Sequence, residues 1–282
     1  QGGANGSIRL EAELARRENR GLRDRGLALL RPLVEAAGDG VSSVRRGGLS
    51  WADAIALAGA VAVSASGGPS IQLELGRVDS DEPDPEFVKP NLKLGRPAIK
   101  GAPDSRISDR SAVITTLPSA GLGSEGLDNF FGRRFGFSRE EIVALCGAHT
   151  LGRHASLLGV SKECLKAPRL TDECIESGKR LPFVANADRF DNSYFQKLIE
   201  WDARTLEPGT AYFIPTDAVL VVVPAFRKFV ERFARDEPYF FEVFSRAYRK
   251  LSSFGFKGAP SERRRGPVLY SPHPPPFPAP ET

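Results

Sequence analysis

The sequence predicts an all-α fold, and two kinds of observation support this prediction. Helix starts carry capping residues: Ser138 and Glu141 have the S-x-x-E spacing of a capping box, and Ser50 precedes a long apolar run. The apolar residues that follow these starts recur at helical rather than alternating spacing. Only Ile71 to Leu75 has the apolar alternation of a strand.

The helical patterns follow one another along the chain with polar segments between them. The predicted helices are 10–37, 49–67, one that begins at Ser138, 192–200, 216–223, 224–234 and 238–254. The first of them carries an apolar stripe made of Leu22, Leu29, Leu30, Leu33 and Val34. Residues 77–123 are rich in Pro, Gly, Asp and Ser, so they predict a long loop.

Composition limits the classes of function. The chain has 282 residues, of which 41% are apolar, enough for one large domain or two lobes. The longest apolar run, 218–223, is far shorter than the roughly 20 residues of a membrane helix. The net charge of +4 is dispersed except at 45–46 and 263–265, so nucleic-acid binding is not expected. The sequence starts at Gln1 and has no methionine, which fits a processed or partial product.

The three cysteines predict different things. Cys146 lies among apolar residues and is expected to be an inert core thiol. Cys164 and Cys174 flank a short polar segment, where either a disulfide or two free thiols would fit. No C-x-x-C spacing exists, so a structural zinc site is not expected.

The stretch EEIVALCGAHTLGRH, residues 140–154, contains two of the three histidines. Ile142, Cys146 and His149 stand at i, i+4 and i+7, so they share the buried face of a helix. Gly147 and Gly152 leave room for a large group to approach. Spacing alone favours a buried histidine with one hydrogen bond over a ligand, because one histidine specifies no site.

Several segments together resemble ascorbate peroxidase, a class I haem peroxidase related to cytochrome c peroxidase. In chain order they are LSWADAIALAG (49–59), residues 141–154, ANADRFDNSYF (185–195), IPTDAVL (214–220) and the last helix, 236–256. The resemblance implies a haem-peroxidase-type fold with two lobes around a haem pocket. It divides the chain into an N-terminal lobe with its long loop (1–123), a C-terminal lobe (124–256) and an Arg/Pro-rich extended tail (257–282).

The resemblance assigns roles on one side of the haem, the proximal side. His149 matches the histidine that binds the iron of haem b, and Asp217 matches the acceptor for its second ring nitrogen. Asp217 also suits a helix start, and both roles together are expected. Phe183 replaces a tryptophan, so a protein-centred radical is not expected there. His154 matches a residue near a haem propionate.

Two departures weaken neighbouring predictions. The family's potassium ligands match Thr150, Asn186 and Asp191, but Val184 stands where a further oxygen ligand would be. An ascorbate-contacting arginine is replaced by Leu158, inside an insertion of about residues 157–181.

The other side of the haem, where peroxide reacts, needs an arginine, an aromatic residue and a histidine on one helix. In the family this helix precedes the segment that begins at Gln1. No distal arginine or histidine is therefore identifiable in the sequence, and whether the protein is an enzyme stays open.

The N-terminal GGANGSIRL and ELARRENRGL are similar to an ascorbate-peroxidase-like branch found in the chloroplast thylakoid lumen. This similarity predicts a peripheral auxiliary subunit of photosystem II, or of another thylakoid complex, with weak or no catalysis. The tail from Gly258 is expected to be disordered or to lie on that partner as an extended arm. The alternatives are an active haem peroxidase that reduces hydrogen peroxide with ascorbate or a phenolic donor, and a haem carrier without turnover.

Overall fold

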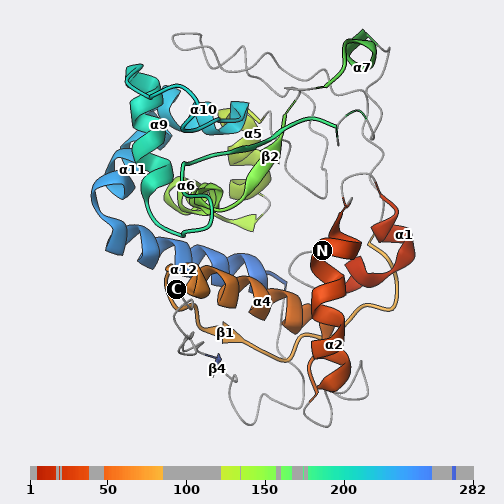
Figure 1. Ribbon diagram of the computed structural model, residues 1–282. Helices are drawn as coiled ribbons and strands as arrows, with labels where there is room; N and C mark the ends of the chain where they lie inside the picture. The colour runs from red at the N-terminus through yellow and green to blue at the C-terminus, as the bar shows by residue number, and fades with distance from the viewer. Residues whose placement is uncertain are drawn as a thin grey trace, which may run out of the picture.

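A computed structural model shows a helix-rich chain, as the sequence predicts (Figure 1). It describes residues 5–16, 19, 21–37, 48–84, 122–133, 135–156, 160–166, 174, 177–255 and 269–270. The α-helices are α1 (Glu11–Leu14), α2 (Ala28–Ala36), α4 (Trp51–Ala65), α5 (Ser124–Leu127), α6 (Arg139–Cys146), α7 (Lys162–Lys166), α9 (Ser193–Ala203), α10 (Pro215–Val222), α11 (Pro224–Arg235) and α12 (Glu237–Ser253). Tighter or wider turns are η1 (Ser7–Arg9), η3 (Arg23–Leu27), η5 (Asp128–Arg133) and η6 (Gly147–Thr150).

Among the residues that the structure describes, four very short strands form two antiparallel pairs. The strand β1 (Leu73–Glu74) pairs with β4 (Leu269–Tyr270), and β2 (Arg153–Ala155) pairs with β3 (Arg180–Pro182). Strand β1 lies inside the segment 71–75 that was predicted as a strand. The β2–β3 pair was not predicted from the sequence, because three residues are too few to show an alternating pattern.

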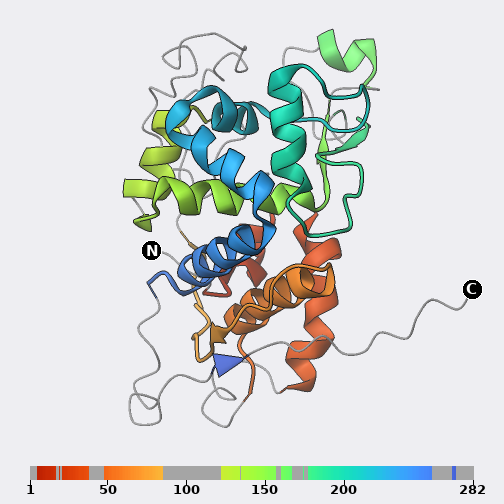
Figure 2. The same cartoon turned by 90° about the vertical axis from the view of Figure 1, so that its left-hand side faces the viewer.

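Helix α12 lies between two groups of helices (Figures 1 and 2). On one side it packs against α6, and α11 packs against α9 and α10. On the other side it runs beside α4, where the Tyr248 hydroxyl donates to the Ala56 carbonyl at 2.9 Å. One apolar core joins α4, α6, α9, α10, α11 and α12. The predicted division at residues 123 and 256 stays a prediction.

The predicted helix caps are confirmed. The Ser50 hydroxyl accepts from the backbone N–H of Asp53 at 3.0 Å and starts α4. At α6 the Ser138 hydroxyl accepts from the Glu141 N–H, and the Glu141 carboxylate accepts from the Ser138 N–H at 2.8 Å. The helices predicted from 192 to 254 are also present, with small shifts at their ends.

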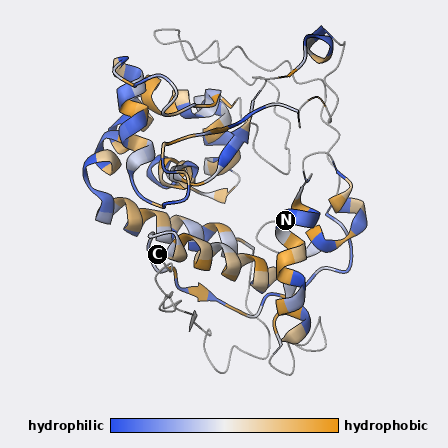
Figure 3. Cartoon of the chain, viewed as in Figure 1, coloured by the Kyte–Doolittle hydropathy of each residue, from blue (hydrophilic) through white to orange (hydrophobic). Residues whose placement is uncertain are grey.

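The prediction of one long helix at 10–37 is wrong. The chain forms α1, the wide turn η3 and α2 instead, and the predicted stripe does not face one core. Leu29 and Leu33 are 70% and 62% exposed, whereas Val34 is 1% exposed. Val34 belongs to a small second core with Trp51 and Ala54. Figure 3 shows the apolar residues along α2 and α4.

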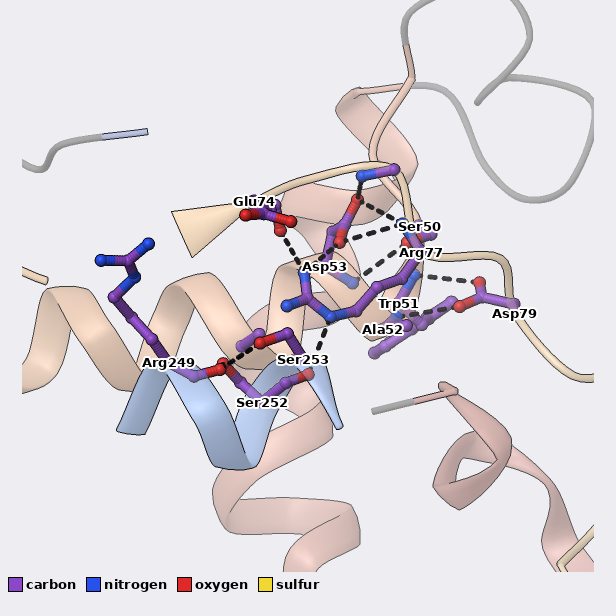
Figure 4. A network of polar contacts seen from close by, with 12 residues as sticks. Ser50, Trp51, Ala52, Asp53, Glu74, Arg77, Asp79, Arg249, Ser252 and Ser253 are labelled. Atoms are coloured by element: carbon purple, nitrogen blue, oxygen red, sulfur yellow. Dashed lines mark hydrogen bonds and ion pairs between the residues drawn. The ribbon is translucent and has the colours of Figure 1, made fainter. Parts of the chain in front are cut away.

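A buried ion pair ties α4 to the end of α12 (Figure 4). The Asp53 carboxylate accepts from the Arg77 guanidinium at 2.7 Å and from the Gly76 N–H at 2.6 Å. The Arg77 Nε–H donates to the Ser252 carbonyl at 3.0 Å. Beside this pair, Asp79 accepts from two N–H groups in the first turn of α4. The network therefore joins segments that are 175 residues apart.

Several predictions fall on residues outside the described part of the chain. They concern most of the 77–123 loop, Leu158, and the tail apart from β4. Among the helices that are described, none is both long enough and apolar enough to cross a membrane.

Candidate functional site

His149 lies where α6 changes into the tighter turn η6, and this change decides where its side chain goes. Helix α6 ends at Cys146, and residues Gly147–Thr150 continue as a 3-10 turn. The predicted α-helical face therefore does not extend to His149, whose side chain is 30% exposed rather than buried in the core. The imidazole is therefore partly accessible from outside the core.

Asp217 holds the His149 ring from the buried side. The two residues are 68 positions apart, and His149 Nδ1 lies 2.8 Å from Asp217 Oδ1. A carboxylate only accepts, so Nδ1 carries the proton and a neutral ring keeps its lone pair on Nε2. In the described part of the chain Nε2 has no hydrogen-bond partner. The ring is therefore oriented to bind a metal ion through Nε2.

The position of Asp217 serves the helix as well as the histidine. It stands in the first turn of α10, is fully buried, and its Oδ2 accepts from the Ile214 N–H at 3.0 Å. This contact satisfies one of the N–H groups at the helix start. Both predicted roles of Asp217, helix-start carboxylate and histidine partner, are present in the structure.

Tyr194 is a third member of the cluster, and its role was not predicted from the sequence. Its hydroxyl donates to Asp217 Oδ1 at 2.6 Å, and its side chain is fully buried on α9. Burial, and then the charge of Asp217, raise the pKa of Tyr194 well above its ordinary value. The sequence feature that could have pointed to Tyr194 is its place in segment 185–195, because a buried tyrosine needs a hydrogen-bond partner.

Aromatic and thiol groups complete the surroundings. Phe183 stacks on the His149 ring with centroids 4.1 Å apart and planes at 2°, which confirms that the two rings are neighbours. Burial and the nearby Asp217 charge raise the pKa of Cys146, so its thiol stays protonated as predicted for an inert group. The space predicted at Gly147 does not exist, because Phe240 and Phe195 fill it.

His154 also contacts Phe183, with ring centroids 4.9 Å apart. Its Nε2 lies 3.2 Å from the Tyr212 carbonyl oxygen and its Nδ1 lies 3.1 Å from that of Ala155. Carbonyl oxygens only accept, so both contacts are hydrogen bonds only when both ring nitrogens carry protons. Both histidines therefore contact the same phenylalanine ring.

The predicted cation ligands are only partly brought together. Thr150 Oγ1 lies 3.2 Å from both the Arg189 carbonyl and an Asp191 carboxylate oxygen. The Arg189 guanidinium already faces Asp191 at 3.4 Å. Asn186 instead accepts from the Asp188 N–H within its own loop. A potassium site stays a prediction.

The insertion beside the site contains the predicted bridge. Cys164 and Cys174 form a disulfide with Cα atoms 5.7 Å apart. Of the two alternatives left open by the sequence, the structure shows the disulfide.

Comparison with known proteins assigns the chain to a family. The family model described as Peroxidase matches residues 1–236. The chain belongs to the peroxidase family. Because the His149–Asp217 pair and the Phe183 stack lie inside the matched region, they belong to the peroxidase-like part of this chain.

Its relatives support the class I, ascorbate-peroxidase-like part of that family. Cytosolic L-ascorbate peroxidase 1 of rice (Oryza sativa subsp. japonica) is 35% identical over 258 residues, which are 92% of this chain and 79% of the relative. Chloroplastic L-ascorbate peroxidase T of Arabidopsis thaliana is 34% identical over 268 residues, 93% of this chain and 52% of the relative. An Aspergillus fumigatus protein, named provisionally as a heme-binding peroxidase, is 32% identical over 93% of this chain and 70% of its own length.

Proposed function

We propose that this peroxidase-family chain binds haem b through Nε2 of His149 and reduces hydrogen peroxide. The single observation that carries the haem-binding part of the proposal is the His149–Asp217 contact of 2.8 Å, which leaves Nε2 of a partly exposed side chain without a partner among the described residues. Peroxide reduction is proposed from membership of the peroxidase family. A histidine kept only for packing does not need a buried carboxylate that fixes its tautomer. The intact pair favours a haem-binding role over the role without haem.

Each residue of the cluster has a task in this proposal. Asp217 orients His149 and makes it a more basic ligand. Tyr194 donates to the same carboxylate oxygen and so moderates the charge that His149 senses. Phe183 fixes the plane of the imidazole. When bound, haem would supply the redox chemistry that cleaves the O–O bond of peroxide.

His154 suits the rim of the same pocket. A protonated ring is the form that satisfies both of its carbonyl contacts, and a cation there would attract a haem propionate. Support for this role is the Phe183 ring, which both histidines contact. Ascorbate is proposed as the electron donor from the names of the relatives alone. A phenolic donor stays the alternative.

A visible absorption spectrum of the haem-loaded protein, recorded before and after hydrogen peroxide, tests the proposal. We expect a Soret band that shifts with peroxide. His149→Gly should lose the band's native form, and added imidazole should restore it, because imidazole occupies the place of the missing side chain. His273→Ala, which removes the histidine of the tail, is the matched control. A native spectrum in His149→Gly without imidazole would refute the ligand assignment.

We also propose a location in the chloroplast thylakoid lumen, beside photosystem II or another thylakoid complex. Support comes from the similarity of the N-terminal segment to the lumenal branch, and the Cys164–Cys174 disulfide suits an oxidising compartment. Fractionation of intact chloroplasts tests this location. Recovery of the protein in the stroma, with both thiols reduced, would refute it.

A further inference from the structure

A half-open cavity of about 300 Å³ lies between β1 and the C-terminal part of α12. It shares no residue with the His149 cluster. Four of the side chains that line it are basic, namely Arg77, Arg246, Arg249 and Lys250, and one, Glu74, is acidic. The question is whether these charges are satisfied within the protein or are available to a ligand.

Three of the basic residues lie on one face of α12. Arg246, Arg249 and Lys250 stand at i, i+3 and i+4, so their side chains leave the helix in neighbouring directions. Arg77 enters from the segment after β1, and its side chain is 2% exposed. The cavity is therefore built by two segments that are far apart in the sequence.

Two of the four charges are already satisfied. Asp53 compensates Arg77 at 2.7 Å. The Lys250 ammonium binds Glu141 at 2.9 Å and the Gly136 carbonyl at 2.6 Å. These two residues shape the cavity and offer little charge to a ligand.

The other two charges are less fully satisfied: Arg246 forms only two long ion pairs, and Arg249 forms none in the described part of the chain. Arg246 is half exposed and faces Glu140 and Glu242 at 3.6 Å each, which is longer than a good hydrogen bond. The Arg249 guanidinium forms no ion pair or hydrogen bond in the described part of the chain. Figure 4 shows the Arg249 side chain extended away from the network around Asp53.

We propose that this cavity binds a phosphate monoester dianion through Arg246 and Arg249. Guanidinium groups are planar and present paired N–H donors that match phosphate oxygens. Two of them one helical turn apart can hold one phosphate group. The volume falls at the lower end of the range for small-molecule sites, about 300 to 1,000 Å³, so the ligand is small.

Two other charged residues provide variants with different expected effects on phosphate affinity. Glu74 lines the same cavity and repels an anion, so its charge limits the affinity. Arg235 is an exposed cation at the end of α11, with no ion pair in the described part of the chain, and it lies outside the cavity. If Arg249 interacted only with the dipole of its helix, replacing it would affect phosphate binding no more than replacing Arg235 at the end of α11.

Titration calorimetry with glycerol 3-phosphate, on the full chain with and without haem, tests the proposal. We expect Arg249→Gln to weaken binding about tenfold, the equivalent of one charge-assisted hydrogen bond. Glu74→Gln should tighten binding, and Arg235→Gln should leave it unchanged. Equal affinities in Arg249→Gln and Arg235→Gln would overturn the proposal.

A lipid headgroup carries the same phosphate monoester, so vesicles form the second arm. Co-sedimentation with phosphatidic acid vesicles that Arg249→Gln abolishes, without binding of glycerol 3-phosphate, would assign the site to a headgroup. No binding to either probe would overturn it. The result does not depend on haem, so failure here leaves the proposal for His149 intact, and the reverse is also true.

Discussion

Asp217 carries the charge on which the His149 cluster depends. Its two oxygens accept from His149, Tyr194 and the Ile214 N–H, and none of its surface is exposed. A buried carboxylate is tolerated only when such donors surround it. Each donor competes for the same charge, so the cluster balances the basicity of His149 against the stability of the buried ion.

Replacing Asp217 by asparagine tests this balance at the histidine. The amide keeps the size of the side chain but removes its charge, so His149 becomes a weaker ligand. We expect haem affinity or the rate of reaction with peroxide to fall about 10- to 100-fold. Stopped-flow absorption of the haem-loaded variant measures the rate. The exposed Asp188→Asn is the control, and an unchanged rate in Asp217→Asn would show that the pair does not tune the ligand.

Replacing Tyr194 by phenylalanine tests the second donor. Loss of a hydrogen bond to a buried charge should reduce the free energy of unfolding by about 1.5 to 3 kcal/mol at pH 7. Because the pKa of Tyr194 is raised in the folded state, this stabilisation is complete below the ordinary pKa of about 10 and is lost as the pH rises through the folded-state pKa.

Urea unfolding at pH values from 7 to 11 measures both effects. The difference between wild type and Tyr194→Phe should be constant to about pH 10 and shrink above it. Tyr239→Phe removes a hydroxyl that donates to Glu140 near the surface, and it should have a smaller effect at pH 7. Equal losses in the two variants would argue against a special role for Tyr194.

At the level of elements, local signals in the sequence predicted helix starts well and contacts across the chain poorly. Ser50 and Ser138 are capping residues whose partners lie three positions away, so spacing alone identified them. The His149–Asp217 contact spans 68 positions and was inferred only from the resemblance to a family. Tyr194 was missed for the same reason, because nothing local points to its acceptor 23 positions away.

The end of α6 shows a second limit. Periodicity extended the helix face to His149, but the chain tightens at Gly147, where Phe240 and Phe195 occupy the space that a side chain would need. Close packing across three helices therefore decides where the histidine points. Packing between helices also explains why Leu29 and Leu33 are exposed, because only one side of α2 contacts α4.

The capping box of α6 makes a prediction that depends on pH. Burial raises the pKa of Glu141. The Ser138 N–H and the Lys250 ammonium together lower this pKa by more than burial raises it, so the net shift is downward. A lowered pKa means that the stabilisation is present above the ordinary value of about 4.3 and is lost as the pH falls through the folded-state pKa. Glu141→Gln should therefore lower stability by about 1 kcal/mol at pH 7 and by almost nothing near pH 2.

Chemical denaturation at several pH values measures this difference. Glu125→Gln provides the control, since Glu125 is an exposed carboxylate in the first turn of α5. If Glu141→Gln reduces the free energy of unfolding by the same amount at low pH as at pH 7, the shape of the Glu141 side chain, and not its charge, stabilises the helix start.

At the level of the whole molecule, α12 is the element that both groups of helices share. Its core side packs on α6, and its last turn receives the Arg77 side chain through the Ser252 carbonyl. Arg77 is held in place by Asp53 in the first turn of α4. The Asp53–Arg77 pair therefore connects α4 to the end of α12 (Figure 4). Helix α12 in turn packs on α6, the helix that leads to His149.

Replacing Asp53 by asparagine should destabilise the whole protein. The variant leaves the Arg77 charge buried without its carboxylate, and removing one partner of a buried pair costs about 3 to 5 kcal/mol. Glu11→Gln breaks the solvent-exposed pair with Arg23 and should cost far less than Asp53→Asn, because water already solvates both charges. Denaturant unfolding followed by both circular dichroism and Trp fluorescence measures the two losses. Equal losses of the free energy of unfolding in Asp53→Asn and Glu11→Gln would show that the buried pair does not hold the two groups of helices together. If the circular-dichroism and fluorescence transitions of Asp53→Asn no longer coincide, the buried pair is what makes the two groups of helices unfold as one unit.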